Sequence, residues 1–153
     1  MKIRSLLIGL ASVALSLSVA GCTKKSEDTP AVLSSDSIKA AVTDFLSEYK
    51  TCLDEKAGSA DGGVNYCVKN NSHTTSFFLK DIADTGLDKK GLNPITCIKG
   101  FPDRFEVFTA TGVTLDEGYA GVHESYAGKT TTVYFQVKTF AGNVQIVGNS
   151  CEA

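Results

Sequence analysis

Apolar residues recur at steps of three and four along residues 38–53, and this spacing predicts an amphipathic helix. The apolar positions form one stripe, whereas Lys39 and Asp44 fall outside it and are expected to face water. Ser35 or Asp36 can cap the helix, because either side chain can accept a hydrogen bond from a free N–H of the first turn. The stripe consists of Ile38, Val42, Phe45, Leu46, Tyr49 and Leu53.

Two shorter helical segments are expected after a loop. Residues 57–65 contain three glycines, a composition typical of a loop. A short helical turn is expected over residues 66–71 and a second helix over residues 77–84, where Thr75 or Ser76 can act as the cap. The side chains of this second helix that we expect to be buried are Phe78, Leu79 and Ile82.

Beyond Cys97 the apolar period changes to two, which indicates β strands. Residues 130–140 alternate most clearly, and a tight turn at residues 141–143 returns the chain as a partner strand. Residues 105–110 and 119–126 are expected to form further strands. The order of elements predicts an α+β fold, with N-terminal helices packed on a curved antiparallel β-meander. One face of the central strand carries Val133, Phe135 and Val137, and the other carries Thr132, Tyr134, Gln136 and Lys138.

This order of elements resembles that of small NTF2-like and cystatin-like domains, over about residues 36–150. Many exported bacterial lipoproteins look similar. The resemblance implies that the helices pack across a curved sheet. Proteins of this kind include enzymes, binding proteins and oligomerisation modules, so the resemblance concerns the fold and leaves the function open.

The first 22 residues carry the features of an export signal. Lys2 and Arg4 form a basic start, and residues 6–20 are apolar or small without a charge. The tetrapeptide Val19-Ala20-Gly21-Cys22 follows. It resembles the lipobox of bacterial lipoprotein signal peptides at all four positions.

The lipobox resemblance implies that residues 1–21 are removed and that Cys22 carries a diacylglyceryl group. The protein is then anchored to a membrane outside the cytoplasm. The residue after Cys22 is not Asp, which favours the outer membrane in a Gram-negative cell. In other bacteria we expect the outer face of the cell membrane. The alternative is an uncleaved membrane helix, since 19 uncharged residues are near the lower limit for crossing a bilayer.

The remaining chain is expected to form a tether and one domain. Residues 22–34 are polar, contain Pro30 and lack apolar periodicity, which predicts a flexible tether. Residues 35–153 are expected to fold as a single globular domain. Loss of the leader removes two basic and no acidic residues, so the net charge falls from −2 to −4. Without a basic surplus, nucleic acid is not an expected partner.

Four cysteines remain besides Cys22, and an even number in an exported domain predicts two disulfides. Three pairings are possible, of which we favour Cys52–Cys67 and Cys97–Cys151. The first would join the end of the long helix to the next segment, and the second would clamp the entry and exit of the sheet. No two cysteines have the close spacing of a zinc site or of a redox motif. We therefore expect neither a metal nor another cofactor.

The leading candidate site is the face of the sheet that points away from the helices. Phe108 and Tyr134 fall on this phase of their strands, and Gln136 and Lys138 accompany them. Aromatic side chains are favoured anchors of interfaces. We therefore expect a binding module that holds an envelope protein or a small apolar ligand on this face.

Two other functions stay open. One is an NTF2-like enzyme with a pocket acid or base such as His123 or Asp103. The other is an inhibitor of an envelope hydrolase that acts through the loop at residues 111–118.

His73 lies in a polar run and is expected either in a solvated loop or at a pocket mouth. His123 and Glu124 cannot form a dyad, because neighbours in a strand point to opposite faces.

Overall fold

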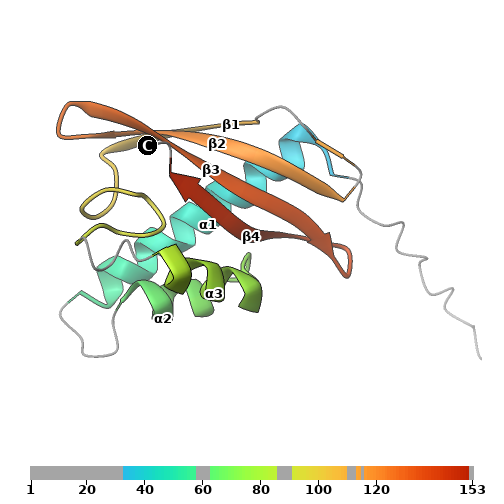
Figure 1. The fold of residues 1–153 in the computed structure, drawn as a ribbon, viewed down its shortest axis with the longest axis horizontal. Helices are drawn as coiled ribbons and strands as arrows, with labels where there is room; N and C mark the ends of the chain where they lie inside the picture. The colour runs from blue at the N-terminus through green and yellow to red at the C-terminus, as the bar shows by residue number, and fades with distance from the viewer. Residues whose placement is uncertain (1–32, 58–62, 86–90, 110–112, 115, 152–153) are drawn as a thin grey trace, which may run out of the picture.

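The computed structural model describes residues 33–57, 63–85, 91–109, 113–114 and 116–151. Within these residues the fold is α+β, as predicted, and helices pack on an antiparallel sheet (Figure 1). The helices are α1 (Ser35–Glu55), α2 (Val64–Lys69) and α3 (Ser76–Thr85). The strands are β1 (Arg104–Thr109), β2 (Glu117–Tyr126), β3 (Lys129–Phe140) and β4 (Asn143–Cys151).

The start of α1 is fixed by a reciprocal cap. The Ser37 backbone N–H donates to the Ser34 hydroxyl at 3.1 Å, and the Ser34 N–H donates to the Ser37 hydroxyl at 2.9 Å. The cap therefore lies one residue before Ser35, the earlier of the two predicted caps. Leu33, which we expected in the tether, is only 5% exposed and belongs to the hydrophobic core. Leu33 and Ser34, which the sequence places in the tether, therefore belong to the folded domain.

The four strands form one open sheet in the order β1-β2-β3-β4, and every neighbouring pair is antiparallel. The turn from β3 to β4 contains Ala141 and Gly142, both with positive φ (48° and 81°). Ala127 and Gly128 show the same pattern between β2 and β3, with φ of 49° and 77°. Two successive positive φ values give a turn whose twist matches that of paired strands. The predicted hairpin around residues 141–143 is therefore confirmed.

The core lies between the apolar stripe of α1 and one face of the sheet. The ring of Phe45 is central, because it meets Tyr49 at 5.9 Å, Phe78 at 5.9 Å and Phe135 at 5.7 Å between ring centroids. It joins α1 to α3 and β3. The sheet residues that face α1 and are fully buried are Ala120, Val122, Val133, Phe135, Val137 and Ile146.

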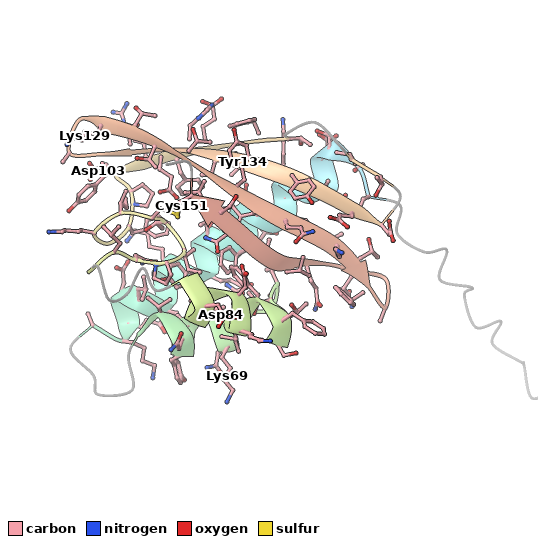
Figure 2. The ribbon with its side chains drawn as sticks, in the orientation of Figure 1. Lys69, Asp84, Asp103, Lys129, Tyr134 and Cys151 are labelled. Atoms are coloured by element: carbon pink, nitrogen blue, oxygen red, sulfur yellow. A yellow bond between two sulfur atoms is a disulfide. The ribbon has the colours of Figure 1, made fainter. Side chains whose placement is uncertain are left out.

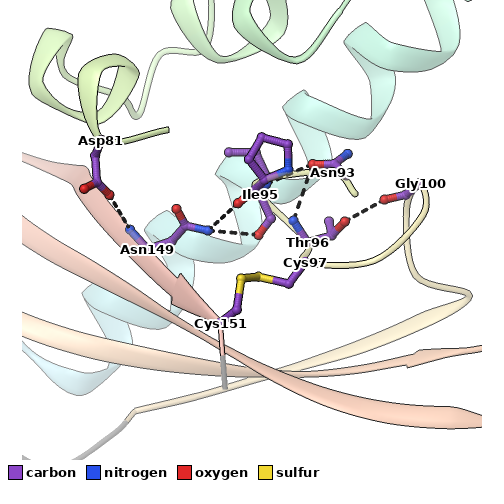
Figure 3. The surroundings of a disulfide bond; sticks show 9 residues. Asp81, Asn93, Ile95, Thr96, Cys97, Gly100, Asn149 and Cys151 are labelled. Atoms are coloured by element: carbon purple, nitrogen blue, oxygen red, sulfur yellow. Dashed lines mark hydrogen bonds between the residues drawn. A yellow bond between two sulfur atoms is a disulfide. The ribbon is translucent and has the colours of Figure 1, made fainter. Parts of the chain in front are cut away.

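The favoured pairing of the cysteines is present in the structure. Cys52 at the end of α1 is bonded to Cys67 in α2, with a Cα–Cα distance of 5.6 Å. Cys97, which precedes β1, is bonded to Cys151 at the end of β4, with a Cα–Cα distance of 5.9 Å (Figure 3). The second bond attaches the segment at residues 91–103 to the end of the sheet.

No helix of the described segments combines the length and apolar character needed to cross a bilayer.

Removal of the Cys97–Cys151 disulfide should destabilise the protein more than removal of Cys52–Cys67. The bonds close loops of 54 and 15 residues, and the chain entropy lost in the unfolded state grows with loop length. We expect the double alanine variants to lose about 4 and about 3 kcal/mol of unfolding free energy, respectively. Urea denaturation followed by circular dichroism measures both losses. A larger loss for the Cys52/Cys67 variant would contradict this ranking.

Candidate binding site

The face of β1–β4 that points away from α1 is called the outer face here. Tyr134, Gln136 and Lys138 of β3 lie on it and are partly exposed, whereas Phe135 and Val137 between them are fully buried. Tyr134 is labelled in Figure 2. The alternation of β3 is therefore as predicted. No helix of the described residues covers the centre of this face, since the helices pack on the opposite side (Figure 1).

An aromatic pair lies across the middle of the outer face. The rings of Phe108 and His123 are stacked, with centroids 4.3 Å apart and planes at 29°. The Phe108 ring fills the space that a Cβ atom of residue 121 would occupy, and this residue is Gly121. Gly121 is paired with Phe108 on one side and with Tyr134 on the other. The two predicted aromatic residues, Phe108 and Tyr134, thus belong to one cross-strand row.

A polar network adjoins this row on β2 and β3. The carboxylate of Glu117 accepts hydrogen bonds from Lys138 Nζ at 2.9 Å, Gln136 Nε2 at 2.5 Å and the Tyr119 hydroxyl at 2.8 Å. These bonds, of which that from Lys138 has the largest effect, lower the pKa of Glu117 to about 2. The pKa values of Tyr119 and Lys138 are raised in return. From the sequence, Glu117 is expected to be a solvated charge in a turn, because only the strand register brings it beside Gln136 and Lys138.

A cavity of about 260 Å³ opens at the side of the outer face where α3 lies beside β4. Gly148 forms part of its lining, and Asp81 of α3 reaches it from outside the sheet. The Asn149 N–H donates to Asp81 Oδ2 at 3.4 Å, which ties α3 to this strand (Figure 3). The sheet side of the lining includes Tyr119, Tyr134 and Gln136. Sequence reasoning missed Asp81, since nothing in the periodicity of α3 places it beside a strand.

His73 is one of the residues that line a different hollow. This hollow, of about 530 Å³, lies between α1, His73 and the start of β4. His73 Nε2 is 3.6 Å from Glu48 Oε1, and the same carboxylate accepts hydrogen bonds from Ser72. A third hollow, of about 480 Å³, lies by α2 and α3, and the described residues of its lining include no titratable side chain.

The remaining sequence candidates do not converge on one site. His123 is exposed on the outer face, while Asp103 accepts a hydrogen bond from the Ala127 N–H at 3.3 Å at the far end of β2. Neither lines one of the three hollows. The loop at residues 111–118 lies partly outside the described residues, as does Cys22 entirely. Within the described chain, no three His, Cys, Asp or Glu residues are grouped so that they could hold a metal ion.

The chain matches no protein-family model, no curated protein and no solved structure.

A buried carboxyl group lies on the inner face of the sheet. Glu124 is 1% exposed, and neither of its oxygens has a hydrogen-bond partner within the described residues. Its partners in the strand register are Phe105 and Thr131. Burial raises the pKa of Glu124 from its ordinary value of 4.5 to about 8. Glu124 and His123 point to opposite faces, as predicted.

Glu124→Gln should remove a pH dependence of stability. The folded protein retains a proton on Glu124 between pH 4.5 and about pH 8, whereas the unfolded chain releases it. The unfolding free energy of the natural protein should therefore fall as the pH rises through this range. Urea midpoints at pH 5 and pH 8 should differ less for Glu124→Gln than for the natural protein. Glu106→Gln, at an exposed position on β1, is the control. Equal pH dependence in all three proteins would refute the assignment.

Proposed function

We propose that this protein is a lipid-anchored, extracytoplasmic interaction module of the bacterial envelope, and that it docks an envelope protein on its outer face. The lipobox-like sequence that ends at Cys22 supports the anchor. The two disulfides are in keeping with an oxidising compartment. We further propose that the domain is of the NTF2-like or cystatin-like kind, on the strength of its element order.

The observation that carries the docking proposal is the one-sided packing of the sheet. The helices bury the inner face, whereas the outer face presents the row formed by Phe108, Gly121 and Tyr134. The stacking of Phe108 on His123 and the hydrogen bonds from Tyr119 and Gln136 to Glu117 already order several side chains of this face. Binding therefore costs little additional side-chain entropy.

A protein partner fits this face better than a small apolar ligand. The aromatic row is shared with charged and amide groups, since Glu117, Gln136 and Lys138 lie on the same face. Mixed aromatic and polar surfaces are typical of protein interfaces. The cavity beside the row contains a carboxylate, Asp81, which disfavours an apolar guest.

Cys22→Ala should release the protein from the membrane. The variant lacks the thiol to which the proposed lipid attaches, so it should appear in the soluble fraction or keep its leader. Fractionation of cells and mass spectrometry of the N-terminal peptide measure both results. Natural protein that lacks a lipid on residue 22 would overturn the anchor and leave the docking face to be tested separately.

Phe108→Ala and Tyr134→Ala should each reduce capture of the partner at least several-fold, because truncation of an aromatic anchor removes much of its buried apolar area. The measurement is cross-linking and pull-down from native envelopes, quantified by mass spectrometry. Tyr66→Ala is the matched control, because Tyr66 is also an exposed aromatic residue but lies on α2. If both outer-face variants capture every partner as the natural protein does, the docking face is wrong.

A further inference from the structure

The cavity over Gly148 has the features of a receptor for a single cationic group. We propose that it takes the guanidinium or ammonium group of an arginine or lysine side chain, presented by the protein that docks on the outer face. This inference deepens the proposed function and rests on it. It assigns a chemical requirement to the partner, namely a basic residue at the edge of its interface.

Two oxygen atoms converge over the backbone of Gly148. Asp81 Oδ2 lies 3.4 Å and Gln136 Oε1 lies 3.5 Å from the point where a Cβ atom of residue 148 would stand. One oxygen comes from α3 and the other from β3, so the cavity is formed only when α3 is packed beside β4. The missing side chain at residue 148 leaves the space between the two oxygens open to a guest.

Both oxygens can only accept hydrogen bonds. The orientation of the Gln136 amide is fixed, because its Nε2 faces the Glu117 carboxylate and the Tyr119 hydroxyl. A carboxylate cannot donate, so the amide nitrogen must lie on that side and Oε1 must lie toward Gly148. Asp81 accepts one long hydrogen bond from the Asn149 N–H, at 3.4 Å. A group that brings several donors is therefore the complementary guest.

The charge of the site favours a cation over a neutral donor such as a sugar hydroxyl. Asp81 forms no salt bridge with any residue that the structure describes, whereas Glu117 nearby is neutralised by Lys138. Tyr119 and Tyr134 are among the lining residues of the cavity, and aromatic side chains can attract cations. An arginine side chain offers five donors and a flat surface for such rings.

The size and surroundings of the cavity favour a side chain of a protein. Its volume of about 260 Å³ is below that of pockets for drug-sized ligands, and one side chain fits this range. Phe77 lies one helical turn before Asp81 and therefore on the same side of α3. Its side chain is 68% exposed. Tyr134 connects the cavity to the aromatic row. A partner can therefore cover Phe77 and the row while its basic residue enters between them.

The test is a titration of the full-length protein in non-ionic detergent micelles with acetyl-arginine amide, followed by NMR of the backbone amides. We expect saturable shifts of the Gly148 and Asn149 signals. Asp81→Asn keeps the shape of the side chain but removes its charge, and it should weaken binding about tenfold. Gly148→Ala should also weaken it, because the added methyl group occupies the space between the oxygens. Gly148 has no positive φ, so this change causes no backbone strain.

The control variant is Asp84→Asn, which removes a charge from the same helix outside the cavity lining (Figure 2). It should bind the arginine probe as the natural protein does. Acetyl-citrulline amide, a neutral analogue of similar shape, and N-acetylglucosamine should cause no comparable shifts. Equal binding of either neutral probe, or unchanged binding by Asp81→Asn, would overturn the cation site.

The two proposals can fail separately. If Phe108→Ala abolishes partner capture while the arginine probe does not bind, the cation site is wrong and the docking face stands. If the natural protein binds the probe and Asp81→Asn does not, while the outer-face variants capture partners normally, the cation site stands without the docking face. If Asp81→Asn weakens both the probe and the captured partner, both proposals are supported.

Discussion

The contact of the Phe45 ring with Tyr49, Phe78 and Phe135 is the interaction on which the remaining structure depends. It holds α1 and α3 against the same face of the sheet, so all large apolar burial occurs on that side. The other face is left to polar and aromatic residues that are ordered among themselves. A small domain gains most of its stability from one core, and here a single layer of helices supplies it.

α3 packs beside an irregular part of β4. The register between β3 and β4 shifts after Gln136, so that Val147 has no direct partner on β3. Asn149 then donates through its side chain to the carbonyls of Pro94 and Ile95 and through its backbone to Asp81 (Figure 3). The Cys97–Cys151 bond fixes the same region covalently. The C-terminal end of β4 thus holds two elements in place, namely α3 and the segment at residues 91–103, which lacks regular secondary structure.

The local elements could be predicted from sequence because their signals are short in range. The stripe of α1, the alternation of β3 and the glycine turn after Phe140 each depend on neighbours within a few residues. The burial of Leu33 and the role of Glu117 could not be predicted in this way, since both depend on the register of elements distant in sequence. The burial of Glu124 was missed for a related reason. A charged residue in an alternating strand is expected to face solvent, but Glu124 falls on the inward-facing side of β2.

β1 lies at one edge of the sheet, and one side of its backbone has no strand partner within the described chain. A free edge is a template on which another chain can add a strand, and this leads to aggregates. The exposed Arg104 and Glu106 place both signs of charge along β1. An incoming strand would have to strip water from these groups, which opposes uncontrolled polymerisation. The charges along β1 therefore limit edge-to-edge pairing when copies of the protein collide.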